Sequence, residues 1–436
     1  MSVVDVILKA VAGLSATALA SIGPHAVRAV GEQSRARPPV IATLGDLNGD
    51  GLADFVTCAV APDPLLVDGG TVTVSTRSAK NGDVIKTITH HVPCSPTSAL
   101  CVGRASSDSG VDFVVAYTGG TRHRTRVSRV IGTSVHTVQD HCECTARVEL
   151  YTASSLAQRT IANRPDAGDR FGASMAYFGA DQRGSGRWLL VGAPGDLNAN
   201  PQRAGYVSLV SIDKALEVER LALPGEFNAA GAAFGAQVVV GNLGRSSGRR
   251  LVVAAPAIDG GRGAVLAFDS QFRLIWAQKG SAAEDGFGGC LASIGDVNDD
   301  GEEDYAAAAT SKYVWILSGL DGSKIWAIES PWRGTRVDGF GSSVVALCGV
   351  DGRPSEVIAI GAHEFMADND GYEVGLYSSV AGAKLGVRGT DEQCVVYGGY
   401  VPASGCYGGL LVLEPFSGTL RQFAGTDLKE VFAMKP

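Results

Sequence analysis

A dipeptide that returns at nearly regular intervals is the feature that most limits how this chain can fold. Phenylalanine followed by glycine recurs 63, 53 and 53 residues apart, at Phe171-Gly172, Phe234-Gly235, Phe287-Gly288 and Phe340-Gly341. Behind each pair comes a strand of small residues, at 191–194, 253–256, 306–309 and 360–362. A fixed period of this length is typical of a protein built from repeated structural units.

The unit at residues 285–328 shows what one repeat contains. After Phe287-Gly288 a short apolar run extends to Ile294, and three further candidate strands follow at 305–309, 313–317 and 324–328. Asp321-Gly322, between the last two, is a strong signal for a β-hairpin turn. Four short strands in about 45 residues match the size of one blade of a β-propeller.

These units resemble FG-GAP repeats, the blades of the propeller found in integrin alpha-subunit heads and in many secreted bacterial proteins. Phe171-Gly172, taken with Val191-Gly192-Ala193-Pro194, is the closest match to the motif that gives the repeat its name. The resemblance covers most of the chain after about Pro39. It implies an all-β fold, a seven-bladed β-propeller of four-stranded antiparallel blades, and it favours export from the cell.

The chain is expected to consist of a leader and linker at residues 1–37, the propeller at residues 38–425 and a C-terminal tail at residues 426–436. Pro38-Pro39 marks the first boundary, because proline cannot continue a helix. The last unit, at 392–423, has no Phe-Gly pair. We expect residues near the N-terminus to supply its missing strand, since an open edge would expose unpaired backbone groups. Seven blades are expected, with six or eight as alternatives.

The N-terminal segment bears on localisation. A mildly apolar stretch at residues 10–20 ends in Ala18-Leu19-Ala20, which fits the cleavage site of a secretory signal peptide. The positive charge expected before it is weak, because Asp5 offsets Lys9, so a structured or loose N-terminal segment is the alternative. No apolar run is long enough to span a bilayer. We therefore expect a secreted or cell-surface protein without a transmembrane segment.

Composition limits the classes of partner. Charged residues make up 19% of the chain and its formal net charge is −8, which argues against nucleic acid as the main partner. Glycine accounts for 57 of 436 residues, and with 45% hydrophobic residues this indicates many tight turns rather than disorder. The expected partner is a protein or a glycan, bound by a monomer.

Two loops carry the chemistry of a calcium site. Positions 1, 3, 5 and 9 are Asp46, Asn48, Asp50 and Asp54 in the first unit, and Asp296, Asn298, Asp300 and Asp304 in the fifth. The backbone carbonyls of Leu52 and Glu302, at position 7, would add a further ligand. Calcium takes six to eight oxygen ligands at about 2.3–2.6 Å, and short acidic side chains at alternate positions of a tightly wound loop can point at one centre. We predict two bound calcium ions.

The two loops begin like an EF-hand loop but differ from it later. Position 12 is Thr57 in one and Ala307 in the other, where an EF-hand has a bidentate glutamate. The flanking segments are predicted strands, so an EF-hand or a dockerin-like domain is disfavoured. The loops resemble the calcium loop of integrin-type blades. The alternative is a metal-free turn held by bonds from side chains to the backbone.

The other units carry altered versions of the loop. Arg187 in the third unit and Arg250 in the fourth stand where Asp54 and Asp304 stand, so that a fixed cation takes the place of the metal. The second unit has Arg104, Asp108 and Asp112 at positions 1, 5 and 9, and the shortened loop of the sixth keeps Asp351 and Glu356. We predict no calcium in these four units.

An insertion around residues 121–134 interrupts the second unit. Arg122, Arg124 and Arg126 fall on one side of it if the segment is extended. The insertion is interpreted either as a positive ledge for an acidic partner or, more simply, as a solvated hairpin face.

No catalytic residues are predicted. The Gly-x-Ser-x-Gly pattern at residues 244–248 lies inside an altered loop rather than between a strand and a helix, and the chain contains neither H-E-x-x-H nor a P-loop. We predict a non-enzymatic, calcium-binding scaffold for extracellular binding or adhesion. The alternative is a propeller-type polysaccharide lyase or hydrolase, which would need charged residues converging at the mouth of the central channel.

Overall fold

The part of the chain that the computed structural model describes consists of β-strands, their connections and one short helical turn. The chain divides into two units, Met1–Arg37 and Pro38–Pro436. The first unit, and with it the expected signal peptide, lies outside the described residues. The structure describes residues 40–44, 46–50, 54–62, 70–92, 96–104, 111–118, 120–131, 134–164, 169–181, 184–195, 202–227, 230–242, 248–309, 312–330, 340–347, 357–366, 369–378, 384–390, 395–398, 409–414, 419–424 and 429–434.

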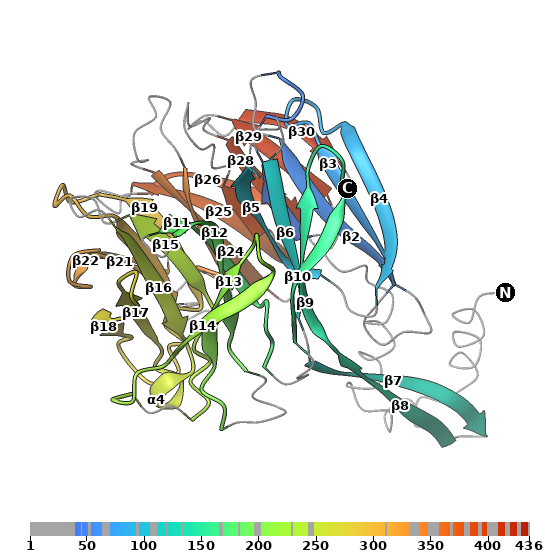
Figure 1. The fold of residues 1–436 in the computed structure, drawn as a ribbon, viewed down its shortest axis with the longest axis horizontal. Coiled ribbons are helices and arrows are strands. Elements are labelled where there is room, and N and C mark those ends of the chain that lie inside the picture. The colour runs from blue at the N-terminus through green and yellow to red at the C-terminus, as the bar shows by residue number, and fades with distance from the viewer. Residues whose placement is uncertain are drawn as a thin grey trace. The chain divides into compact units, whose positions relative to one another are not determined.

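The strands pair into four-stranded antiparallel sheets that follow one another along the chain (Figure 1). The sheets contain β1 (Val40–Thr43), β2 (Phe55–Pro62), β3 (Gly70–Arg77) and β4 (Val84–Val92); β5 (Pro96–Arg104), β6 (Val111–Tyr117), β9 (Ala146–Thr152) and β10 (Gln158–Arg164); β11 (Ser174–Asp181), β12 (Gly184–Ala193), β13 (Tyr206–Ser211) and β14 (Leu216–Ala222); β15 (Val238–Asn242), β16 (Arg249–Ala255), β17 (Ala264–Phe268) and β18 (Leu274–Lys279); β19 (Cys290–Gly295), β20 (Asp304–Ala309), β21 (Tyr313–Leu317) and β22 (Lys324–Glu329); β23 (Ser343–Leu347), β24 (Val357–Met366), β25 (Asn369–Ser378) and β26 (Lys384–Thr390); and β27 (Val395–Gly398), β28 (Gly409–Glu414), β29 (Thr419–Ala424) and β30 (Lys429–Met434). The predicted all-β class and the four-stranded antiparallel organisation are confirmed.

Two elements stand outside these sheets. The helical turn α4 (Ile258–Gly261) connects β16 to β17. β7 (Gly120–Ile131) and β8 (Ser134–Cys144) form a two-stranded hairpin between β6 and β9 of the second sheet. Figure 1 shows this hairpin reaching away from the four-stranded sheets. The insertion predicted in the second unit is therefore a separate β-hairpin.

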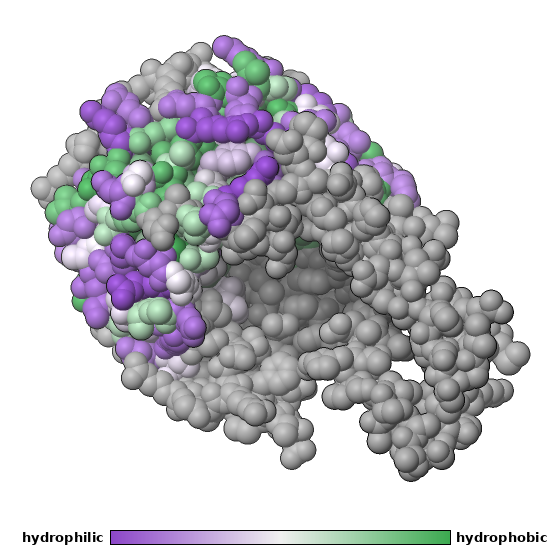
Figure 2. All heavy atoms as spheres, turned by 90° about the horizontal axis from the view of Figure 1, so that it is seen from below, coloured by the Kyte–Doolittle hydropathy of each residue, from purple (hydrophilic) through white to green (hydrophobic). Residues whose placement is uncertain are grey.

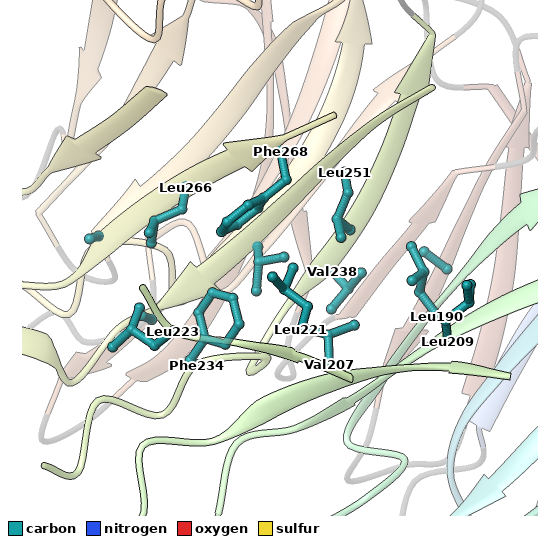
Figure 3. Packing of buried hydrophobic residues seen from close by; sticks show 14 of the residues in the cluster. Leu190, Val207, Leu209, Leu221, Leu223, Phe234, Val238, Leu251, Leu266 and Phe268 are labelled. Carbon is teal, nitrogen blue, oxygen red and sulfur yellow. The ribbon is translucent and has the colours of Figure 1, made fainter. Parts of the chain in front are cut away.

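Neighbouring sheets meet through their first strands. β1 contacts β5, and contacts then run in order through β11, β15, β19, β23 and β27, with β27 contacting β1 again. Apolar side chains fill the spaces between consecutive sheets from the first to the sixth. Between the third and fourth sheets, Leu190 and Leu209 lie in one cluster with Leu251 and Phe268 (Figure 3). The protein therefore has a series of cores between sheets, and each sheet depends on its neighbours to bury its two faces.

Each Phe-Gly pair forms a turn at the entrance to a sheet. The four phenylalanines are at most 1% exposed. The four glycines have φ between +78° and +91°, a region that favours glycine. The N–H of Gly288 donates to the carbonyl oxygen of Ala308 at 2.9 Å, and the same bond joins Gly172 to Gly192, Gly235 to Ala254 and Gly341 to Gly361. The turn and the strand of small residues recur together because one bonds directly to the other.

The end of the chain corrects two expectations. The last sheet consists of β27, β28, β29 and β30, all from the C-terminal part of the chain. The prediction that residues near the N-terminus supply its missing strand is therefore wrong. The prediction of a tail at residues 426–436 is also wrong, because β30 pairs with β29. The outer edge of β29 has backbone groups that need partners, and the adjacent segment supplies them at little cost in loop closure.

Replacing Gly288 by alanine tests the importance of the Phe-Gly turn. A Cβ atom at this position would lie 2.9 Å from the Cβ of Ala254, and φ is +91°. We expect Gly288→Ala to lower the free energy of unfolding by about 2–4 kcal/mol, from backbone strain and overpacking together. Gly286→Ala is the control, since φ is +61° and a Cβ there would meet no atom within 4 Å. It should cost about 1 kcal/mol. Urea unfolding measures both variants. If they lost the same free energy of unfolding, the packing role of Gly288 would be contradicted.

Candidate metal centre

The loop between β1 and β2 is anchored by a buried carboxylate. Asp54 is 0% exposed. Its Oδ2 accepts the N–H of Leu47 at 2.7 Å, and its Oδ1 accepts the N–H of Ala79, in the turn between β3 and β4, at 3.1 Å. Asp46 and Asp50 are exposed, and Oδ1 of Asp46 accepts the N–H of Asp50 at 3.2 Å. Asp54 thus joins the start of its own loop to the neighbouring hairpin turn.

The loop between β19 and β20 repeats this pattern. Asp304 is 0% exposed, its Oδ2 accepts the N–H of Val297 at 2.8 Å, and its Oδ1 accepts the N–H of Gly319 at 2.8 Å. The two loops also share a contact from position 5 to a serine in the hairpin turn. Ser318 donates to Asp300 at 3.1 Å, and Ser78 donates to Asp50 at 3.3 Å. The two loops that match in sequence are therefore built alike, by the same bonds.

Asp296, Asn298 and Asp300 lie close to one another in the second loop. Oδ1 of Asp296 and Oδ1 of Asn298 both accept the N–H of Asp300, at 3.2 and 2.9 Å. Burial is the largest cause that raises the pKa of Asp304 to about 6, and the charges of Asp300 and Asp296 add to it, against the lowering effect of the N–H bonds. The pKa of Asp54 is raised for the same reasons. The loop concentrates negative charge that a bound cation would stabilise.

The donor set fits a hard cation. Carboxylate and amide oxygens are the ligands that calcium prefers, and an oxygen that accepts one N–H still has a second lone pair. The predicted ligand Leu52 lies outside the described residues, as does Gly51. Glu302 is described, and its side chain is buried and 3.5 Å from Arg250. Among the residues that the structure describes, no three His, Cys, Asp or Glu side chains are already gathered around one point.

The altered loop of the third unit presents a cation. Arg187 stands immediately before the buried part of β12, in the place that Asp54 takes just before β2 and Asp304 takes as the first residue of β20. Its Nη1 donates to Oδ2 of Asp112 in the second sheet at 2.7 Å, and its Nη2 lies 2.9 Å from Oδ1 of Asp213. Burial lowers the pKa of Arg187, but the two carboxylates outweigh burial and raise it. The guanidinium therefore neutralises Asp112, which is 1% exposed and occupies position 9 of the neighbouring unit.

The fourth unit places its arginine similarly. Arg250 is 4% exposed, and its Nη2 lies 3.5 Å from Oε2 of Glu302 in the loop between β19 and β20 of the fifth unit. Its Nε and Nη1 have no hydrogen-bond partner within the described part of the chain. Arg250 is a fixed cation at position 9, as expected, but it faces the adjacent unit. Asp108, Asp351, Glu356 and most of the fourth loop lie outside the described residues.

One repeated contact was missed by the sequence reasoning. Asp285 stands two residues before Phe287, and its Oδ2 accepts the hydroxyl of Tyr313, the first residue of β21, at 2.7 Å. In the third unit, Asp169 stands two residues before Phe171 and accepts the hydroxyl of Tyr206, the first residue of β13. Aspartate before Phe-Gly and tyrosine after the small-residue strand are visible in the sequence, so comparing the two units could have revealed the pair.

Comparisons with known proteins identify the fold. No family model and no curated protein matches the chain. Solved structures do: Saccharomyces cerevisiae Sqt1 (TM-score 0.51, 11% identity, covering 92% of this chain and 86% of that chain), BBS1N in complex with ARL6DN (0.51, 13%, 92% and 93%) and the Dos1 propeller (0.50, 11%, 92% and 86%). The chain therefore has a β-propeller fold, as predicted. At these identities the likeness extends to the fold alone. In the described part, no helix has the length and apolarity to cross a membrane.

Replacing Arg187 tests whether its guanidinium supplies the positive charge that Asp112 needs in place of a metal ion. Arg187→Met leaves Asp112 buried and unpaired, so we expect the free energy of unfolding to fall by about 3 kcal/mol. Arg187→Met combined with Asp112→Leu should cost less than Arg187→Met alone, because no buried charge remains. Arg273→Met removes an exposed ion pair with Asp269 and should change stability by less than about 0.5 kcal/mol. If the free energy of unfolding of Arg187→Met were no lower than that of Arg273→Met, the role assigned to the Arg187 guanidinium would be refuted.

Proposed function

We propose that this protein is a calcium-stabilised binding scaffold of the FG-GAP type, a seven-bladed propeller that acts outside the cell. The observation that carries the proposal is the matching architecture of two loops at distant points in the chain. Asp54 and Asp304 are both buried, and each accepts one N–H from position 2 of its own loop and one from the adjacent hairpin turn. A metal-free turn could be built from several kinds of polar residue, so it would not require the same buried carboxylate in both loops.

The pairing of the strands into successive four-stranded sheets supports the proposed seven blades. The last sheet lies beside the first through β27 and β1. The turn from Phe-Gly to small-residue strand, present in four units, supports the FG-GAP type. In the proposed complex each calcium ion is held by four side chains and one backbone carbonyl. The ligands are Asp46, Asn48, Asp50, Leu52 and Asp54 in one site, and Asp296, Asn298, Asp300, Glu302 and Asp304 in the other.

Calcium would act on stability rather than on chemistry. It would neutralise carboxylates that repel one another and fix each loop against the hairpin turn beside it. The two loops then need an environment rich in calcium, since sites of this kind in extracellular modules bind at about 0.1–1 mM. An affinity in this range would suit a secreted or cell-surface location. BBS1N, which has a similar fold, was solved in complex with ARL6DN, and we propose a protein partner for this chain too.

Calorimetry on chelator-treated protein tests the two sites. Calcium should bind with a stoichiometry of two, and 10 mM calcium should stabilise the fold by about 2 kcal/mol per site if the Kd is about 0.5 mM. Asp296→Asn with Asp300→Asn should remove one site, and Asp46→Asn with Asp50→Asn the other. Asp83→Asn with Asp321→Asn is the control, because these exposed aspartates lie in hairpin turns of the same two sheets. Absence of both heat and thermal stabilisation would exclude the calcium sites.

A further inference from the structure

The surface visible in Figure 2 suggests that docking on it is not driven by apolar contact. Hydrophilic and hydrophobic residues are interspersed over the described part of this face. Large exposed apolar side chains such as Val84, Leu216 and Ile275 belong to outer strands of three different sheets. No broad apolar patch is formed by the described residues in this view. Charge and backbone pairing are therefore the more informative features.

The hairpin of β7 and β8, here called the arm, has two outer edges that are left unpaired by the strands the structure describes. β7 and β8 pair with each other over most of their length and with no other strand in the described part of the chain. An isolated two-stranded ribbon is marginally stable at best in water. Its outer edges present rows of N–H and C=O groups, which are a template for a further strand. The arm is therefore a surface that another extended chain can complete.

The strand register gathers arginines on one face of the arm. Arg122, Arg124 and Arg126 occupy alternate positions of β7, opposite Cys142, Asp140 and Val138 of β8. A register shift between Val127 and Arg129 places Arg129 opposite His136, which shares the face of Val138. Four arginine positions and one aspartate position therefore share this face. The opposite face carries Thr121, His123, Thr125 and Val127, paired with Glu143, His141, Gln139 and Thr137.

The root of the arm is fixed by a buried polar network. Tyr117 ends β6 just before the arm, and it is 0% exposed. Its hydroxyl lies 3.2 Å from Nε2 of His90 in the first sheet and 3.4 Å from the hydroxyl of Tyr151. Tyr151 donates to Oε2 of Glu149 at 2.8 Å, and Arg147, just after the arm, donates to Oε1 of Glu149 at 2.8 Å. Both ends of the arm therefore leave from a packed part of the fold.

We propose that the arm binds an extended acidic segment of a partner protein, which adds a third strand to the arm and sets carboxylates against its arginine face. Alternate residues of a strand recur about every 7 Å, so a partner strand with acidic residues at every second position matches Arg122, Arg124 and Arg126 in spacing. Arginine pairs with carboxylates through two parallel hydrogen bonds. This inference rests on the proposed function only in taking the chain to be a binding scaffold, and it does not depend on the calcium loops.

An acidic peptide fits the arm better than a polyanion without a peptide backbone, such as a nucleic acid, does. Only a polypeptide backbone supplies the alternating N–H and C=O groups that complete a strand edge. The chain as a whole carries a formal net charge of −8, which repels long polyanions such as nucleic acids at a distance. A short acidic segment needs only the local positive charge of the arm.

Fluorescence anisotropy with two labelled peptides of equal composition tests the proposal. One peptide of twelve residues alternates glutamate and threonine, and the other has six glutamates followed by six threonines. The alternating peptide should bind the full chain, and the triple variant Arg122→Gln, Arg124→Gln, Arg126→Gln should weaken binding by about tenfold or more. The control Arg203→Gln, Arg220→Gln, Arg273→Gln removes three exposed arginines elsewhere and changes the net charge equally; it should bind like the unaltered chain.

Three results would overturn the proposal: no binding of the alternating peptide, equal binding of the two peptides, or equal weakening by both triple variants. Tighter binding of single-stranded DNA than of the alternating peptide would overturn the choice of a peptide as occupant. Calcium titration of the same proteins separates the two proposals. The triple variant of the arm should bind calcium with an unchanged heat. If peptide binding is lost while that heat is unchanged, the loss is due to the arm and not to the calcium loops.

Discussion

A charged side chain buried at the start of a sheet's second strand is the constraint on which the candidate site depends. Asp54 and Asp304 have no exposed surface, and an ionised carboxylate in that position is stable only if other groups compensate for the lost water. Two backbone N–H groups do so in each case, one from the loop and one from the hairpin turn beside it. The same carboxylate therefore determines how the loop is folded and where a cation would be held.

The sign of the charge at this position divides the units into two kinds. Where it is negative and the loop carries further acids, as at Asp304, the compensation is a proposed calcium ion. Where it is positive, as at Arg187 and Arg250, the compensation comes from a carboxylate of the adjacent unit. Asp112 is negative at the same position, but its counter-charge comes from Arg187 of the adjacent sheet. Ion pairs between sheets and cations within loops are then two solutions to the same problem of buried charge.

The repeats could be predicted from the sequence because each one depends on local requirements. A turn with positive φ needs glycine at Gly172 and Gly288. The backbone hydrogen bond from that turn to the small-residue strand limits how far apart the turn and the strand lie in the sequence. The contact between Arg187 and Asp112 could not be predicted, because the two residues are 75 positions apart and no local pattern pairs them. The last sheet was misjudged because it lacks the Phe-Gly turn, which left β30 without a sequence signal. The equal bonding of the two loops was not visible in the sequence either, because it depends on N–H groups of hairpin turns that lie 15 and 25 residues further along the chain.

Anomalous diffraction from crystals grown with calcium would test the central claim most directly. We expect two calcium peaks, one beside Asp46, Asp50 and Asp54 and one beside Asp296, Asp300 and Asp304, with none beside Arg187 or Arg250. Fully occupied lattice sites elsewhere with no density at either loop would contradict it, as would a calcium ion bound next to either arginine.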